Sequence, residues 1–360
     1  MATSDVRAIC VENERWYQDW NMITLWESAT EDPIFTFIKK GFGLPRPRQC
    51  TPIKGGLIND TYDIDGTWVL QHVNPIFGEA VNDDIAALTP ILRQGGVNVP
   101  LLCRATTGAW SLEGSDFGLK TGRWRLMTKI AGASRDHVES IEQIRALTVA
   151  IARFHGALDG CRYAFRHSRS GVHDFQRHYD NLERTLASLD YRQHRLYGDV
   201  RHLFEKIQAL SRFVPFDSVM ACEDLRIIHG DPKISNFMMD GDAVCGVVDL
   251  DTLARSRVAF DVGDAIRSWC NPCPEDVEPQ FNREFAREML GLYLECAPYL
   301  SRSERESLSA SAPFIALELS MRFAKDALCE DYFGFNPDIG HGEHSFLRAK
   351  AMFTLCSQML

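Results

Sequence analysis

Along the first third of the chain, short apolar runs alternate with glycine-containing turns, a pattern typical of antiparallel strands. A turn at Asp65-Gly66 separates two of these runs. One segment with helical spacing precedes the strands and a second lies between them, and each of the two ends at glycines. The pattern therefore predicts a sheet with two helices. The predicted strands cover residues 53–56, 61–64, 68–73, 99–104 and 124–130, and the predicted helices cover residues 32–40 and 79–93.

After Gly132 the pattern becomes mostly helical, with apolar residues three and four positions apart. Two short apolar runs between the helices, LRIIHGD and VCGVVDLD, indicate buried strands that end in carboxylates. Asp231 and Asp249 are thus expected at strand ends, at the edge of a core. The three apolar helix faces comprise Ile141, Ile144, Leu147, Ile151, Phe154 and Leu158; Phe281, Phe285, Met289 and Leu292; and Phe314, Leu317, Met321, Ala324 and Leu328.

The chain has 360 residues, more than one compact core usually holds, so we expect two lobes with a cleft between them. The predicted fold class is α+β. A lobe built on an antiparallel sheet would cover residues 1–130, and a mostly helical lobe would cover residues 131–360.

Charge and composition exclude several classes of partner. The formal net charge is −10, and Lys and Arg are scattered, which argues against nucleic acid. No apolar run of about 18 residues is present, and the first residues lack the apolar centre of a signal peptide. We therefore expect a cytoplasmic protein without a membrane partner, with its eleven cysteines reduced. The pattern indicates no oligomeric state.

The segment from His229 to Asn236 has the spacing H-x-D-x-x-x-x-N of a kinase catalytic loop. In that chemistry one carboxylate accepts the proton of an acceptor hydroxyl, and an amide oxygen on the same loop reaches Mg²⁺. These roles fall to Asp231 and Asn236, and Asp249 after the next strand would chelate the same metal. The alternative, a simple polar turn, is disfavoured because a strand pattern lies on each side.

Neighbouring residues have predicted supporting roles. Asp251 is either a second metal ligand or a hydrogen-bond acceptor for the loop, and Lys233 supports the site from within the loop. His229 is expected to be structural, with its ring bonded to loop carbonyls. The motif thus predicts a two-lobed, protein-kinase-like enzyme that uses ATP and Mg²⁺, with nucleotide bound by residues 1–130 and a small-molecule acceptor bound by residues 131–360.

The segment HGDPKISNFMMDGDAVCGVVDLDTL resembles the aminoglycoside phosphotransferase and choline kinase superfamily, with Gly230 where protein kinases have arginine. Four further blocks are similar to the N-acetylhexosamine 1-kinase branch, as is the tail DYFGFNPDIGHGEHSFLRAKAMF. They are GGLINDTY (55–62), VLQHVN (69–74), FDVGDAIR (260–267) and LELSMRFAKDAL (317–328). The resemblance covers nearly the whole chain.

The resemblance implies roles for residues of the first lobe. The turn at Gly55-Gly56, with Asn59 and Thr61, would cover the nucleotide with backbone amides facing the phosphates. The alternative is a hairpin in which these residues serve only turn geometry.

In the second lobe, the resemblance implies that Arg322 and Tyr332 contact the sugar. The alternative for Arg322 is an ordinary surface stripe of ion pairs with Glu318 and Asp326, which lie one helical turn to each side. Arg267 is expected to brace the metal loop by bonding Asp261 or Asp264.

The strand that usually carries a phosphate-binding lysine reads Val69-Leu70-Gln71-His72. His72 is therefore expected to point into the cleft and contact phosphates, and the following helix offers Asp83 where the fold usually has glutamate. The alternative is that His72 is a satisfied core histidine and that Gln71 or Lys54 supplies the contact.

Three functions follow from these observations. The leading prediction is an ATP-dependent kinase for the anomeric hydroxyl of an N-acetylhexosamine or related hexose, with a role in carbohydrate metabolism. The second is a kinase for another hydroxyl metabolite or for an aminoglycoside. The third is a catalytically silent nucleotide-binding protein, which His72 favours and the intact set of Asp231, Asn236 and Asp249 disfavours.

Overall fold

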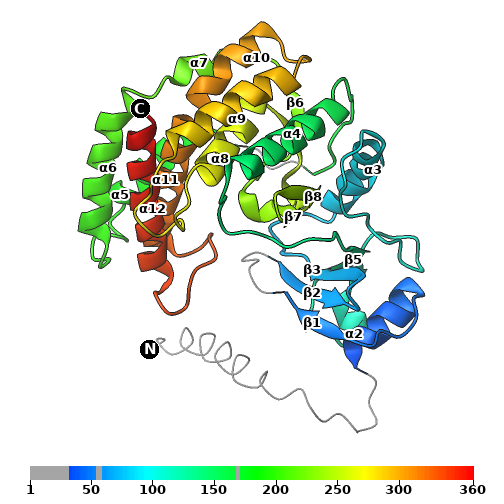
Figure 1. Cartoon of the computed structure of the whole chain (residues 1–360). Coiled ribbons are helices and arrows are strands. Elements are labelled where there is room, and N and C mark those ends of the chain that lie inside the picture. Colours follow the sequence, from blue (N-terminus) through cyan, green and yellow to red (C-terminus); the bar gives the residue numbers. More distant parts are fainter. Residues whose placement is uncertain (1–31, 54–58, 168–170) are drawn as a thin grey trace, which may run out of the picture.

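In the computed structural model, which describes residues 32–53, 59–167 and 171–360, a small antiparallel sheet lies beside a larger, mostly helical body (Figure 1). The α+β, protein-kinase-like fold is confirmed. Within the described residues the sheet has five strands in the order β1-β2-β3-β5-β4, with antiparallel neighbours. The strands are β1 (Cys50–Pro52), β2 (Asp60–Ile64), β3 (Trp68–His72), β4 (Leu112–Glu113) and β5 (Arg123–Thr128).

The predicted turn between β2 and β3 is confirmed, and its backbone explains the sequence. Asp65 and Gly66 both have positive φ, 54° and 68°, which a tight hairpin turn requires and which aspartate and glycine tolerate. Side chains then alternate between the two faces of the sheet. One face, with Ile64, Leu70 and Trp124, packs into a small core. The other face is turned to the cleft described below.

The small core is completed by the first helix. A proline and apolar residues begin it at α2 (Pro33–Thr36), and a π-helical turn at Phe37–Gly41 follows. Phe37 is buried and packs edge-on against Phe117 and near Trp124. The predicted helix over residues 32–40 is therefore confirmed, including its end near Gly41.

The predicted strand over residues 99–104 is wrong. This segment forms only an isolated bridge between Leu102 and Met127, with Pro100 near its start. Proline has no N–H to donate, so a regular ladder cannot run through it. The outer strand of the sheet is instead β4, whose two residues pair with β5.

The larger body, formed mainly by residues 131–360, consists mostly of helices. Of the described residues, they are α4 (Ile141–Ala157), α5 (Phe175–Ala187), α6 (Tyr197–Ser211), α7 (Phe216–Met220), α8 (Val258–Trp269), α9 (Arg283–Cys296), α10 (Arg302–Ser307), α11 (Ser311–Cys329) and α12 (His341–Met359). Short strands lie among them: β6 (Arg226–Ile228) pairs with β9 (Ala254–Ser256), and β7 (Phe237–Asp240) pairs with β8 (Ala243–Val247).

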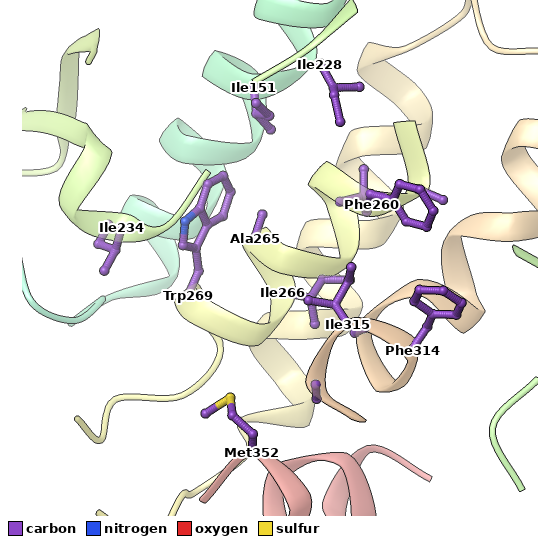
Figure 2. Close-up of a cluster of buried hydrophobic side chains, with 14 of the residues drawn as sticks. Ile151, Ile228, Ile234, Phe260, Ala265, Ile266, Trp269, Phe314, Ile315 and Met352 are labelled. Atoms are coloured by element: carbon purple, nitrogen blue, oxygen red, sulfur yellow. The ribbon is translucent and has the colours of Figure 1, made fainter. Parts of the chain in front are cut away.

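The centre of the large core is α8, which Figure 2 shows with Phe260, Ala265, Ile266 and Trp269 as sticks. All four are buried. The helix packs closely on α11, and at Gly263 an added Cβ would lie 2.6 Å from the carbonyl oxygen of Ser311. A glycine at this position thus lets α8 approach the neighbouring backbone.

Helix α3 (Val81–Gln94) was predicted from its apolar side, and that side packs away from the small core. Ile85, Leu88 and Leu92 belong to the same buried cluster as Ile144 and Ile151 of α4. The helix is thus anchored to the helical body although it precedes β5 in the sequence. The lobe boundary at residues 130 and 131 falls between β5 and α4 and stays a prediction.

Among the described residues, no helix combines the length and the apolar composition that crossing a membrane would require.

Candidate active site

A cleft of about 1820 Å³ is lined from both parts of the molecule. The sheet contributes Thr61, Gln71 and Arg125, and the helical body contributes Asp231 and Asn236. Its other lining residues include Asn59, Lys233, Asp249, Asp251, Asp264, Arg267, Glu275, Arg322 and Tyr332. Predicted residues from distant parts of the sequence therefore meet in one cleft.

The loop after β6 is held in place from behind. The carboxylate of Asp261, on α8, accepts hydrogen bonds from the backbone N–H groups of His229 and Gly230 at 2.7 and 2.8 Å. His155 Nε2 lies 2.9 Å from the same carboxylate. Burial works to raise the pKa of Asp261, but its hydrogen bond from His155 lowers the pKa overall. Asp261 thus acts as an ionised anchor for the loop.

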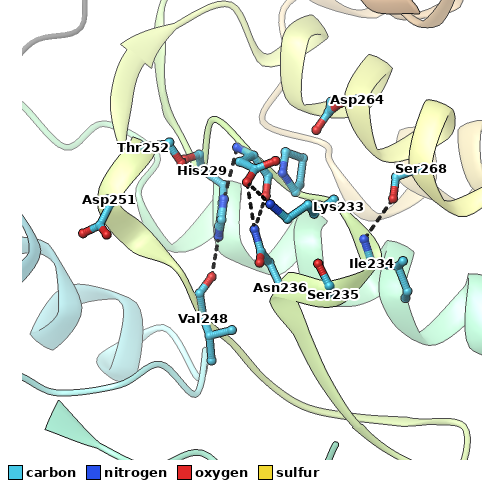
Figure 3. A network of polar contacts seen from close by, with 12 residues as sticks. His229, Lys233, Ile234, Ser235, Asn236, Val248, Asp251, Thr252, Asp264 and Ser268 are labelled. Atoms are coloured by element: carbon cyan, nitrogen blue, oxygen red, sulfur yellow. Dashed lines mark hydrogen bonds and ion pairs between the residues drawn. The ribbon is translucent and has the colours of Figure 1, made fainter. Parts of the chain in front are cut away.

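Gly230 is required by this geometry. Its φ is +85°, and a Cβ built on it would lie 2.3 Å from the carbonyl oxygen of Thr252. The ring of His229 bonds the carbonyl of Val248 through Nε2 at 2.9 Å, as Figure 3 shows. The predicted structural role of His229 is therefore confirmed: its ring joins the loop to the end of β8.

Asp231 is surrounded by groups that keep it ionised and oriented. Lys233 Nζ lies 2.7 Å from Oδ2, and Nδ2 of Asn236 donates to the Asp231 carbonyl at 2.7 Å (Figure 3). Burial favours the neutral acid, but the ammonium of Lys233 outweighs it, so the pKa of Asp231 is lowered. Within the described residues, no group donates a hydrogen bond to Oδ1. That oxygen can therefore accept a proton from a hydroxyl.

Asn236 and Asp249 offer oxygens that the described residues leave without donors. Asn236, which lines the cleft, uses its Nδ2 on Asp231, and its Oδ1 receives no hydrogen bond from the described residues. Asp249 lies two residues after β8 in a left-handed conformation, φ 63° and ψ 61°. Burial, and next the charge of Asp251, raise the pKa of Asp249 to about 6. A cation would relieve that cost.

These oxygens suit Mg²⁺, a hard ion that takes one or two protein carboxylate or amide ligands and otherwise binds water and phosphate. Among the described residues there is no group of three or more His, Cys, Asp or Glu side chains placed to hold a metal ion. A two-ligand site from Asn236 and Asp249 is compatible with that finding. When bound, the ion would neutralise charge on nucleotide phosphates.

The predicted hydrogen bond between Asp251 and the loop is wrong, because within the described residues the partners of Asp251 come from the first lobe instead. Both of its oxygens are occupied by Arg125, at 2.6 and 2.8 Å, and Oδ2 also accepts from Asn59. The side chains of Arg125 and Asp251 are only 2% and 0% exposed. Asp251 therefore contacts the sheet across the cleft.

The expectation that His72 points into the cleft is wrong. Strand alternation puts it on the core face, where it is 5% exposed and tilts against Trp124, with ring centroids 5.0 Å apart. Its Nδ1 lies 3.1 Å from Asp60, and its Nε2 lies 3.1 Å from the carbonyl of Thr121. The alternative, a satisfied core histidine, holds, and the neighbouring Gln71 faces the cleft.

This placement predicts that His72→Lys destabilises the fold without altering nucleotide use. We expect the free energy of unfolding to fall by about 1–3 kcal/mol, because the contact with Thr121 is lost in a buried setting. The KM for ATP and its pH profile should stay unchanged. Denaturant unfolding measures the stability and initial rates measure the KM, with His202→Lys, at an exposed position of α6, as the control. A raised KM with unchanged stability would contradict the placement.

Asp83 also differs from expectation. Its carboxylate is 41% exposed and pairs with Arg166 at 3.0 Å, and Asp83 is not among the residues that line the cleft. The side chain that α3 directs inward is the preceding one, Asn82, whose Oδ1 accepts a hydrogen bond from Arg125 at 3.1 Å. The shift by one residue arises because the helix begins at Val81 and turns Asn82 to its buried side.

Arg267 bonds Asp264 at 2.6 Å, which was one of its two expected partners. It also bonds Glu275 at 2.8 Å, and Arg348 bonds the other oxygen of Glu275. Burial raises the pKa of Asp264, because the charge of Arg267 offsets only part of it. Glu275, which the sequence did not indicate, thus links two arginines beside the catalytic loop.

Arg322 and Tyr332 both line the cleft. The guanidinium of Arg322 lies 5.8 Å from the Tyr332 ring centroid, and its Nη1 lies 3.5 Å from Glu318 Oε1. The alternative of a surface stripe is wrong, because Glu318 and Asp326 are 0% and 1% exposed. Asp326 accepts a hydrogen bond from the backbone N–H of Tyr332 at 2.8 Å and so fixes the loop after α11.

Of the residues predicted to cover the nucleotide, Gly55 and Gly56 lie outside the described residues, as does Lys54. Asn59 and Thr61 line the cleft. Asn59 bonds Asp251 and the backbone N–H of Asn74, and Thr61 accepts a hydrogen bond from Gln71. Their proposed nucleotide contacts stay predictions.

Comparisons with known proteins agree with this geometry. Residues 49–299 match the phosphotransferase enzyme family (APH). A homoserine kinase from Methylobacterium sp. (strain 4-46) is 30% identical over 97 residues, a match that spans 27% of each protein.

Solved structures share the fold at low identity. An amicoumacin kinase in complex with AMP-PNP has a TM-score of 0.62 and 14% identity, and the match covers 92% of this chain and 94% of that one. A GDP complex of aminoglycoside 2'-phosphotransferase-IIIa has a TM-score of 0.58 and 12% identity, covering 90% and 99%. A choline/ethanolamine kinase family protein from Mesorhizobium loti has a TM-score of 0.51 and 17% identity, covering 86% and 92%.

The family match covers more than half of the chain and includes the loop with Asp231, Asn236 and Asp249. An anchored loop, an ionised carboxylate with one open oxygen and a pair of metal-type oxygens are the parts that phosphoryl transfer needs. This chain therefore belongs to the phosphotransferase enzyme family.

Proposed function

We propose that this phosphotransferase moves the γ-phosphoryl group of ATP, with Mg²⁺, to the anomeric hydroxyl of an N-acetylhexosamine or a related hexose. The observation that carries the kinase part is the open Oδ1 of Asp231 in the same cleft as the free oxygens of Asn236 and Asp249. Asp231 would accept the proton of the acceptor hydroxyl as the hydroxyl oxygen attacks phosphorus. Asn236 and Asp249 would hold the metal that the phosphates share.

We place the acceptor in the part of the cleft lined by Asp264, Arg267, Glu275 and Arg322, and call this part the acceptor end. Its charges favour a neutral acceptor. Two of the carboxylates that line the cleft already have cationic partners: Arg267 bonds Asp264, and Arg267 and Arg348 both bond Glu275. A polycationic acceptor such as an aminoglycoside would be bound by carboxylates without such partners. Sugar hydroxyl and acyl oxygens suit the mixture of arginine and aromatic side chains at this end.

Arg322 and Tyr332 are proposed to contact the acceptor. Tyr332 Oη lies 3.5 Å from Arg322 Nη2, and Arg322 also lies over the ring of Phe333, 5.5 Å from its centroid. The guanidinium thus lies within 6 Å of two ring centroids, and its N–H groups can donate to an acyl or hydroxyl oxygen. The sequence blocks that resemble the N-acetylhexosamine 1-kinase branch include Arg322.

The test is the position of the new phosphate. With purified protein, ATP and Mg²⁺, we expect an N-acetylhexosamine with a free anomeric hydroxyl to release ADP and to carry phosphate at C1. Its methyl glycoside, which keeps every other group, should release no ADP above background. The measurement is a coupled ADP assay followed by phosphorus NMR of the product.

Phosphate at C6, or turnover only with choline, homoserine or an aminoglycoside, would overturn the anomeric acceptor while leaving the phosphotransferase assignment. No magnesium-dependent ADP release with any of these acceptors would favour the third function, a silent nucleotide-binding protein. Against that function stands Asp231, whose open oxygen has no use in a protein that only binds nucleotide.

A further inference from the structure

A buried polar cluster joins the cleft face of the sheet to the metal loop. Its centre is the ion pair between Arg125 on β5 and Asp251, two residues after Asp249. The two side chains meet through two parallel hydrogen bonds of 2.6 and 2.8 Å, and both are almost completely buried. Two-pronged contacts between arginine and a carboxylate are the most directional ion pairs in proteins.

Three amide side chains complete what we call the Arg125 cluster. Gln71, directly opposite Arg125 in the sheet register, accepts from Nε at 3.1 Å and from Nη2 at 2.7 Å. Asn82 of α3 accepts from Nη1 at 3.1 Å, and Asn59 donates to Asp251 at 2.9 Å. The guanidinium has five N–H donors, and these contacts use all of them. Arg125 thus has no donor left for a nucleotide phosphate.

The Arg125 cluster connects two different parts of the sequence. Asn59, Gln71, Asn82 and Arg125 all precede or lie on β5, whereas Asp251 lies on the 3₁₀ helix Leu250–Thr252 that follows the metal residue Asp249. Asp251 therefore receives three hydrogen bonds from the sheet side of the cleft. Asp249, on the same short loop, receives none from the described residues. One carboxylate fixes the loop, and the other stays open.

We infer that Arg125 is a positioning residue. Through Asp251 it fixes the position and orientation of the metal loop, residues 249–252, relative to the sheet face that covers the nucleotide. The inference rests on the proposed function, because it assumes that phosphates lie between that face and Asp249. A buried ion pair adds little stability relative to apolar residues of similar volume. Its contribution here is geometric, since a displacement of about 1 Å at the reacting atoms can cost roughly 100-fold in rate.

The test separates geometry from stability. In Arg125→Met/Asp251→Asn both charges are removed together, so neither is left buried without a partner, and the introduced amide oxygen can still accept from Asn59. We expect a melting temperature within about 5 °C of wild type. We expect kcat to fall by roughly 100-fold. A purely structural pair would instead leave kcat unchanged in a variant that folds normally.

A second variant covers the case in which the double substitution does not fold. Arg125→Lys keeps the charge and loses the two-pronged geometry, so kcat should fall by at least about 10-fold although a cation remains. The matched control is Arg226→Met/Glu304→Leu, which removes a largely buried arginine–glutamate pair of the helical body outside the cleft. That variant should keep wild-type kcat at temperatures where it is folded.

Binding measurements exclude direct phosphate contact by Arg125. Without Mg²⁺, the Arg125→Met/Asp251→Asn and Arg125→Lys variants should both bind ATP and adenosine as the wild type does, because Arg125 offers phosphate no donor. With Mg²⁺, the gain in ATP affinity should be smaller than in the wild type. A selective loss of metal-free ATP binding would show that Arg125 is a phosphate ligand and overturn the inference, as would kcat within two-fold of wild type in both variants.

The proposed function and the inference fail differently. If the wild type releases no ADP with any acceptor, the proposed function fails, while the effect of Mg²⁺ on ATP affinity still tests the cluster. If the wild type turns over and the variants do too, only the inference fails.

Discussion

Asp231→Asn is expected to lower kcat by roughly 10²–10⁴-fold while ATP binds with unchanged affinity. The asparagine keeps the shape of the side chain but cannot accept a proton at neutral pH. In the structure, the ammonium of Lys233 outweighs the effect of burial and lowers the pKa of Asp231. The wild-type carboxylate is therefore ionised. Its open Oδ1 is the acceptor that the substitution removes. Single-turnover phosphoryl transfer and isothermal titration with ATP measure the two quantities.

The control for this prediction is Asp240→Asn, an exposed aspartate of β7 in the hairpin that follows the same loop. It removes one negative charge from the same region without touching the cleft, so it should keep wild-type kcat. If Asp231→Asn turns over within a few-fold of wild type at saturating substrates, Asp231 is not the general base. The loop would then serve only to hold the metal.

The proximity of Asp231, Asn236 and Asp249 could be predicted from sequence because it is local. Asp231 and Asn236 lie on one loop, and Asp249 follows after a single hairpin, so spacing and flanking strands nearly determine their neighbourhood. The structure brings these three residues to one cleft. Asp261 was expected only as a possible partner of Arg267, and its role as the anchor of the loop was missed because that contact joins positions 31 and 32 residues apart.

His72 and Asp83 show where local reasoning failed. In a strand, a shift of one residue moves a side chain to the opposite face, so the choice between Gln71 and His72 depended on a register that the sequence leaves open. In α3 an error of one residue had the same effect: Asp83 was expected to face the cleft, but Asn82 makes the inward contact, with Arg125. Both errors came from placing this chain's residues on a pattern that usually has lysine and glutamate.

The Arg125 cluster could not be predicted from sequence at all. Arg125 and Asp251 are 126 positions apart; the sequence marked Asp251 as a candidate site residue but gave no sign of its partner Arg125. The alternation in RWRLMT does place Arg123, Arg125 and Met127 on one face of a strand, but it does not say which face meets the cleft. Only the packing of the sheet on the helical body decides that.

Asp249→Asn is expected to lower kcat/KM by about 100-fold or more and to raise the Mg²⁺ concentration needed for half-maximal activity. A metal ion at a transferring phosphoryl group contributes several kcal/mol, and each 1.36 kcal/mol is a factor of about ten. Asparagine is the informative substitution because Asp249 has a φ of 63°, a conformation that asparagine tolerates and alanine does not. Magnesium titrations of the ADP-release rate measure the shift.

The stability of the same variant separates loss of the metal from damage to the loop. Within the described residues, the Asp249 carboxylate accepts no hydrogen bond, and its pKa is raised to about 6 by burial and by Asp251, so its charge is poorly stabilised without metal. Replacing it with a neutral amide should leave the melting temperature in EDTA unchanged or higher. Asp249→Ala, which adds backbone strain of about 1–2 kcal/mol, should melt lower than Asp249→Asn. If Asp249→Asn instead has an unchanged magnesium titration, or melts well below wild type in EDTA, the carboxylate is a structural residue of the loop and the metal is held elsewhere.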